Sequence, residues 1–132
     1  MKECYVKITP SGIVSTVQID RESFNETIYR LINCEVWEGV PVHVPGVGGL
    51  YMILDENGKI GIRPKMFNYI ASKLYNNPLD FIVGDVIICD LRYVPSDEPG
   101  IEEELDCCPL TDVQSAGLFS YIIEIMRRLN GL

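Results

Sequence analysis

Residues 54–60 read LDENGKI and place two carboxylates, an amide and an amine between two aliphatic residues. Such a set could transfer protons or hold a cation. It does not fit a calcium loop, because that motif needs glycine at its sixth position, and Gly58 is the fourth residue counted from Asp55. An Asn-Gly pair between apolar stretches is instead typical of a β-hairpin. We therefore predict that this segment is a turn.

The register of this hairpin follows from the alternation of side chains along a strand. A two-residue loop would place Asp55 opposite Ile60 and mix charge into an apolar face. A three-residue turn over 56–58 avoids this, and it requires Gly58 in the left-handed conformation. Asp55 then faces Lys59, a cross-strand pair that contributes ~0.2–1 kcal/mol. The apolar pairs expected in this register are Leu54 with Ile60 and Met52 with Ile62.

Other residues with reactive side chains give no recognisable site. His43 is the single histidine, so the chain alone cannot build a multi-histidine metal site or a His-dependent triad. Its valine neighbours predict a half-buried strand position. The glycines of GVGG at 46–49 are expected to connect strands, because phosphate loops lie between a strand and a following helix. We predict no catalytic, cofactor-binding or metal-binding residue.

The chain has five cysteines and no C-x-x-C spacing. Cys4, Cys34 and Cys89 lie in apolar stretches, where a buried reduced thiol is usual. Cys107 and Cys108 are adjacent and could form a redox- or metal-sensitive pair. No neighbouring Lys, Arg or His in the sequence would stabilise a thiolate there, so we expect structural thiols.

The most distinctive feature is an acidic segment. The 132-residue chain has a net charge of −8, and residues 93–126 contain eight carboxylates and no Lys or Arg. We expect a solvated loop at about 95–110, and we also consider a docking surface for a basic protein or a weak cation site. Binding to nucleic acid or to an anionic membrane is not expected. The candidate partner-binding residues are Asp97, Glu98, Glu102, Glu103, Glu104 and Asp106.

The periodicity of apolar residues predicts six strands and three helices. Pro41 and Pro45 favour an edge strand or an irregular arm for the third of these segments. β-branched residues on both faces place the last strand at the centre of the sheet. The strands are expected at 4–9, 13–19, 35–44, 50–54, 59–62 and 80–91.

The helices are expected at 21–33, at 64–74 and at about 112–129. Ser23 with Glu26, and Thr111 with Gln114, have the spacing of capping boxes. Pro64 suits a first helical position. The resulting order, β-β-α-β-β-β-α-β-α, predicts an α+β fold in which helices pack on a mainly antiparallel sheet. Residues 1–132 form one domain, and the absence of a secretory h-region or a membrane span predicts a cytoplasmic protein.

The order of motifs also resembles a known family. ITPSG near the start, GGLYMILDENGKIGI at 48–62, Asn68, and DFIVGDVIICD at 80–90 are similar to domain of unknown function 3846, over about residues 5–90. The resemblance implies a small protein carried by phages, plasmids and other mobile elements of bacteria. It brings no catalytic or binding residues, and the acidic segment and the last helix lie outside it.

We expect a non-enzymatic accessory protein that acts by protein binding, with the acidic segment as its contact surface. The alternative is a small-molecule binding protein or a hydrolase that uses carboxylates near Tyr51, Asp55 and Asn68. A homo-oligomer formed through the C-terminal helix is a third hypothesis, because that helix is apolar on more than one side.

Overall fold

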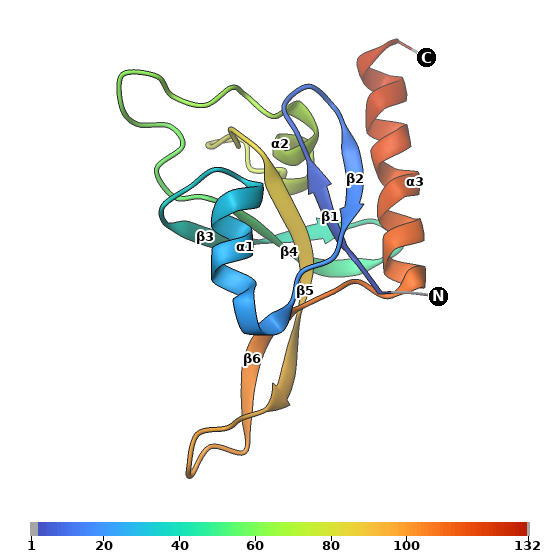
Figure 1. Ribbon diagram of the computed structural model, residues 1–132. Helices are drawn as coiled ribbons and strands as arrows, with labels where there is room; N and C mark the ends of the chain where they lie inside the picture. Colours follow the sequence, from blue (N-terminus) through green and yellow to red (C-terminus); the bar gives the residue numbers. More distant parts are fainter. Residues whose placement is uncertain (1–2, 132) are drawn as a thin grey trace.

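An antiparallel sheet runs through the molecule, and helices lie against it (Figure 1). The computed structural model describes residues 3–131; residues 1, 2 and 132 of the expected 1–132 domain lie outside the described range. The helices are α1 (Phe24–Leu31), which follows a 3-10 turn at Arg21–Ser23, α2 (Tyr69–Tyr75) and α3 (Asp112–Leu129). The strands are β1 (Tyr5–Ile8), β2 (Val14–Val17), β3 (Trp37–Val44), β4 (Gly48–Asp55), β5 (Val86–Pro95) and β6 (Glu103–Cys108). The predicted α+β class is confirmed.

The strand order in the sheet is β2-β1-β5-β4-β3, and β6 pairs with the outer part of β5. β5 therefore lies at the centre, as its apolar sequence predicts. Residues 86–89 of this strand are fully buried and lie between β1 and β4. β3 is an edge strand, as predicted, and this position tolerates Pro41 because one side of the strand has no hydrogen-bonding neighbour.

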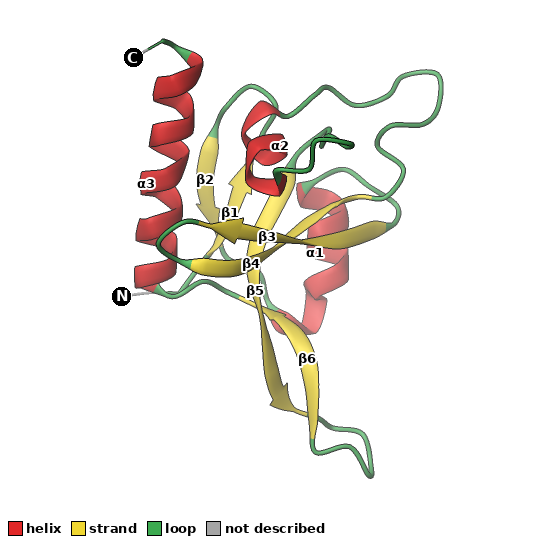
Figure 2. Cartoon of the chain, turned by 180° about the vertical axis from the view of Figure 1, so that it is seen from behind, coloured by secondary structure: helices red, strands yellow, loops and turns green. Residues whose placement is uncertain are grey.

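Helices cover both faces of the sheet. α1 covers one face, where Ile28 packs with Ile87 of β5. α2 and α3 cover the other face, where Leu118 packs in the same cluster as Ile88. Figure 2, seen from behind, shows α3 and α1 on either side of the strands. Burial of each such side chain contributes about 1.5–3 kcal/mol, so the central strand is stabilised from both sides.

A buried asparagine fixes the start of α2. The Oδ1 atom of Asn68 accepts a hydrogen bond from the backbone N–H of Ala71 at 3.1 Å, which caps the helix. α2 therefore begins at Tyr69, and the predicted helical position of Pro64 is wrong. Phe67, which lies within the predicted range 64–74, precedes the helix and is exposed.

The two predicted capping boxes have different outcomes. Thr111 and Gln114 form theirs in full, with reciprocal side-chain hydrogen bonds of 3.2 and 2.9 Å at the start of α3. Ser23 makes no side-chain cap, because a 3-10 turn leads into α1 and gives Ser23 a backbone conformation outside the usual capping region. The predicted α3 boundaries, 112–129, are confirmed.

The hairpin predicted for residues 54–62 is wrong. β4 pairs with β3 along one edge and with β5 on the other, so more distant strands occupy both sides of it. The chain turns after Asp55, whose carbonyl accepts from the N–H of Gly58 at 3.2 Å. Gly58 does not adopt the left-handed conformation, and Ile62 is fully exposed rather than paired with Met52.

The predicted ion pair across that turn is wrong as well. Lys59 pairs with Asp80, and Asp55 pairs with Lys65 at 2.9 Å. Both pairs join the turn to segments more than nine residues away in the sequence. LDENGKI is thus a turn, as predicted, but one that long-range contacts hold in place.

The predicted loop at 95–110 is wrong in its second half, because Glu103–Cys108 form β6. β5 also extends to Pro95, so the acidic segment is a β-hairpin whose loop covers residues 96–102. The observed order is β-β-α-β-β-α-β-β-α. Within residues 3–131, no helix combines the length and the apolar character needed to cross a membrane.

Candidate functional site

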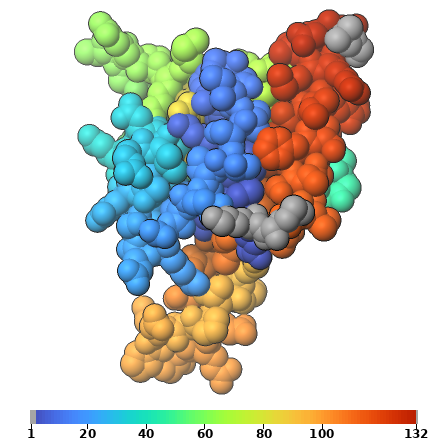
Figure 3. All heavy atoms as spheres, turned by 45° about the vertical axis from the view of Figure 1, so that its right-hand side comes forward, coloured from blue at the N-terminus to red at the C-terminus, as the bar shows by residue number. Residues whose placement is uncertain are grey.

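The outer half of β5, the 96–102 loop and β6 form a two-stranded arm, defined here as residues 90–108. The strands pair from Asp90 with Cys108 to Pro95 with Glu103. Figure 1 shows the arm extending beyond the sheet, and the space-filling view in Figure 3 shows it as a protrusion at the bottom of the molecule. The arm is therefore the part of the fold best placed to touch another molecule.

All six predicted partner-binding residues lie on this arm. Asp97 and Glu98 are in the loop, Glu102 directly precedes β6, and the other three are in β6 itself. All are exposed except Asp106, which is half-buried and pairs with Arg21. The structure thus gathers the acidic residues into one projecting element.

Exposed apolar side chains accompany these carboxylates. Tyr93 faces Leu105 directly across the two strands, and these side chains are 71% and 53% exposed. Ile101, in the loop, is 46% exposed. Mixed apolar and charged surfaces are typical of protein interfaces, in which aromatic residues supply much of the binding energy.

A groove of about 750 Å³ separates the arm from the start of α1. Phe24 and Trp37 lie on the α1 side, in an edge-to-face contact with ring centroids 6.2 Å apart. The Trp37 indole N–H donates to Asn25 Oδ1 at 3.0 Å, which fixes the indole ring. The arm side has Leu105 and Cys107, with carboxylates on the rim at Asp97, Glu104 and Asp106. Arg21 also lines this groove and pairs with Asp106. The aromatic rings and the two other carboxylates, Asp97 and Glu104, favour a further positively charged side chain.

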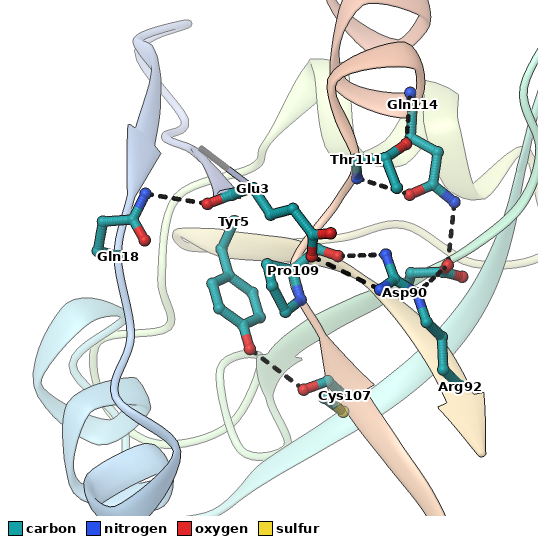
Figure 4. A network of polar contacts seen from close by, with 9 residues as sticks. All are labelled: Glu3, Tyr5, Gln18, Asp90, Arg92, Cys107, Pro109, Thr111 and Gln114. Atoms are coloured by element: carbon teal, nitrogen blue, oxygen red, sulfur yellow. Dashed lines mark hydrogen bonds and ion pairs between the residues drawn. The ribbon is translucent and has the colours of Figure 1, made fainter. Parts of the chain in front are cut away.

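A polar network holds the base of the arm against α3 (Figure 4). The Asp90 carboxylate accepts from Arg92 Nε at 3.1 Å and from Gln114 Nε2 at 2.9 Å. The Arg92 guanidinium also donates to the carbonyl of Pro109 at 2.7 Å and lies 3.6 Å from Glu3. Because the same Gln114 caps α3, the direction of the arm is coupled to the helix start.

A second contact at the base of the arm joins Tyr5 to two thiols. The Tyr5 hydroxyl donates to the carbonyl of Cys107 at 3.2 Å. Burial, and then the neighbouring Cys89, raise the pKa of Tyr5 above its ordinary value. The neighbouring Cys107 thiol, and then burial, raise the pKa of Cys89, whereas the neighbouring Cys89 thiol lowers the pKa of Cys107. Cys107 is thus the most acidic thiol of this contact.

The lowered pKa of Cys107 could not be predicted from its neighbours in the sequence. All five cysteines are free thiols; Cys4 and Cys89 are buried as predicted, whereas Cys34 is half-buried. The partner that lowers the pKa of Cys107 is Cys89, eighteen residues away in the sequence and on the other strand of the hairpin. Recognition of the β5–β6 hairpin would have placed the two thiols on the same face of it.

Tyr51, Asp55 and Asn68, the residues of the alternative hydrolase hypothesis, each have structural partners. Tyr51 packs in the α1 cluster, and Asp55 is only 10% exposed and is paired with Lys65. The Nδ2 atom of the fully buried Asn68 donates to the carbonyls of Ile8 and Gly84, at 3.1 and 2.8 Å. These three side chains therefore hold the fold together.

His43 also differs from its prediction, because it is exposed on β3 rather than half-buried. It is not among the residues that line the groove beside the arm. GVGG forms the tight connection from β3 to β4, in which the N–H of Val47 donates to the carbonyl of Val44 at 2.9 Å. Among the described residues, no three His, Cys, Asp or Glu side chains converge as a metal site.

Comparison with known proteins adds no relative: no protein-family model, no curated protein and no solved structure matches this chain. The arm is therefore interpreted from its own geometry and charge.

Proposed function

We propose that the protein is a non-enzymatic accessory factor that binds a positively charged protein partner through its acidic arm. One observation carries this proposal: six carboxylates and three exposed apolar side chains lie on a hairpin that projects from the sheet. Within the described chain, Asp106 is the only one of the six in an ion pair. The other five are available to a partner.

Two further features support this function. The polar network at the arm's base, centred on Asp90 and Arg92, orients the hairpin and so reduces the entropy that binding must overcome. The resemblance of residues 5–90 to domain of unknown function 3846 supports an origin in a bacterial mobile element, where small accessory proteins act on the machinery of the host. A cytoplasmic location fits such a role.

The test is co-purification of the tagged protein from its native host, followed by mass spectrometry. The arm variant changes Glu102, Glu103 and Glu104 to Gln. A matched control changes Glu35, Glu38 and Glu56 to Gln, since these are also exposed and lie on the body of the protein. We expect a basic protein to co-purify with the wild type and the control but at least about tenfold less with the arm variant. Equal recovery with all three proteins would refute the proposal.

A further inference from the structure

A second surface differs from the arm in chemistry. It consists of the rings of Phe67, Tyr69 and Phe81 with the amines of Lys59 and Lys73, here called the aromatic patch. The Phe67 centroid lies 6.4 Å from that of Tyr69 and 6.0 Å from that of Phe81. Lys59 Nζ lies 4.3 Å from the Phe81 centroid and Lys73 Nζ 5.6 Å from the Tyr69 centroid. The rings line a groove of about 630 Å³.

The aromatic patch is exposed although its backbone is firmly held. Phe67 and Phe81 are 51% and 47% exposed. Phe67 forms a β-bridge with Val83, and on either side of it the N–H of Gly84 donates to Met66 at 2.7 Å and that of Asn68 donates to Ile82 at 2.9 Å. The fold therefore presents these rings at its surface, as expected for a contact site.

The charge near the aromatic patch is opposite in sign to that of the arm, although one carboxylate, Asp80, lines the same groove. Residues 57–79 contain four basic residues and no carboxylate, whereas residues 93–106 contain six carboxylates and no basic residue. Lys59 and Lys65 are paired with Asp80 and Asp55. Of the two amines of the patch, Lys73 makes no ion pair within the described chain, so it remains for an acidic ligand.

The two surfaces cannot meet within one molecule. Tyr69 and Lys73 of α2 line the aromatic groove. Figures 1 and 2 show α2 and the arm at opposite ends of the fold. The arm tip has Pro95, Pro99 and the exposed Ile101 among its carboxylates. Proline and isoleucine suit aromatic rings, and the carboxylates suit Lys73.

We propose that the arm of one copy docks in the aromatic patch of a second copy, so that the protein self-associates head to tail. The inference rests on the proposed function, because it uses the same arm and takes the lysine-bearing aromatic patch of a second copy as the surface that the arm binds. Such a contact is heterologous: each copy keeps one arm and one patch for further neighbours, so assemblies grow beyond two copies or close into rings. The narrow tip limits the contact area, so association depends on concentration.

The test is sedimentation velocity on the purified full chain over a concentration series. For this test the arm variant is a different one, with Ile101→Ser, Glu102→Lys and Glu103→Lys. The patch variant carries Phe67→Ser and Lys73→Glu. Lys73→Glu alone, at an exposed position of α2, serves as a patch variant that leaves the buried core unchanged. Arg30→Glu, an equal charge change on exposed α1, is the matched control.

We expect the wild type and Arg30→Glu to form species larger than a dimer, and each arm or patch variant to associate at least about tenfold more weakly. A 1:1 mixture of the arm and patch variants should form a species that stops at two copies, because one intact arm meets one intact patch. A wild type that stays monomeric, or a mixture that stays monomeric, would overturn the proposal. The proposal would also be overturned if the wild type is monomeric and a host protein co-purifies with the wild type but not with the patch variant. Another protein would then occupy the patch.

The two proposals fail separately. Self-association is measured on purified protein alone, whereas binding to a host partner is measured by co-purification. The proposed function would be refuted, and the head-to-tail contact would stand, if the wild type self-associates and the variant with Glu102, Glu103 and Glu104 changed to Gln still captures the same host proteins.

Discussion

The inner and outer halves of β5 belong to one continuous strand and yet have opposite surroundings. Residues 86–89 are fully buried between β1 and β4, with helices over both faces. From Asp90 to Pro95 the strand pairs with β6 and is half-buried, with Tyr93 and Pro95 exposed. The inner half stabilises the fold and the outer half presents side chains to a partner, so substitutions in the two halves should affect different measurements.

The largest effect on stability is expected at Asn68, which joins the inner half to its neighbours. Replacement by Ala leaves the buried carbonyls of Ile8 and Gly84 without their donor and removes the cap of α2. We expect the free energy of unfolding to fall by about 3 kcal/mol. Urea unfolding followed by circular dichroism measures it.

Two further variants test this explanation. Asn68→Asp keeps the capping oxygen but cannot donate to either carbonyl, so it should be at least as unstable as Asn68→Ala. Asn57→Ala, at an exposed position, should change stability by less than about 0.5 kcal/mol. Full stability of Asn68→Asp would show that only the cap matters.

A smaller loss is expected at Thr111, where α3 begins beside the base of the arm. Thr111→Ala removes the side-chain acceptor for the N–H of Gln114, and this should cost about 1 kcal/mol. Thr111→Ser keeps the acceptor and should lie within about 0.5 kcal/mol of the wild type. If Thr111→Ala unfolds like the wild type, the capping box contributes nothing to stability.

The contact between Tyr5 and the arm should give a loss that depends on pH. Tyr5→Phe removes the hydrogen bond to the Cys107 carbonyl and should cost about 0.5–1 kcal/mol at pH 7. The pKa of Tyr5 is raised in the folded chain by burial, whereas the unfolded chain ionises near pH 10. The stability from neutral Tyr5 is therefore complete below about pH 10 and is lost as the pH rises beyond it.

Urea titrations between pH 7 and pH 11 check this prediction. The gap between wild type and Tyr5→Phe should close above about pH 10, and exposed Tyr93→Phe should run parallel to the wild type. A constant gap over the whole range would contradict the raised pKa.

The smallest effect on stability is expected in the outer half of the hairpin. Changing Glu102, Glu103 and Glu104 to Gln should leave the free energy of unfolding within about 0.5 kcal/mol of the wild type, since these side chains are exposed. Thermal unfolding measures this. A loss above about 1 kcal/mol would mean that the arm belongs to the core, and the contrast between the two halves of β5 would not hold.

The sequence predicted those parts of the fold whose signals are local. The capping box at Thr111 and the alternation of Tyr5 with Val6 depend on near neighbours, and both α3 and β1 are confirmed. The apolar run of β5 indicated its central place. The acidic residues were also identified in advance, although as a loop rather than as a hairpin.

The errors arose where distant partners decide the structure. Asn57-Gly58 is a strong local hairpin signal, yet β3 and β5 pair with β4 and leave Ile60 and Ile62 exposed. β6 was missed because its carboxylates and the flanking prolines outweighed the alternation of Leu105 and Cys107. The aromatic patch was missed because Phe67 has helical spacing, although the helix begins only at Tyr69.

The arm's open strand edges have a consequence for solubility. Among the described strands, β6 pairs only with β5, and an exposed strand edge can recruit further strands into a growing aggregate. Charged side chains such as Glu103 and Glu104, with a proline at Pro95, oppose that stacking. Removing these charges, as the change of Glu102, Glu103 and Glu104 to Gln does, should therefore make the arm the place where fibrous precipitation begins.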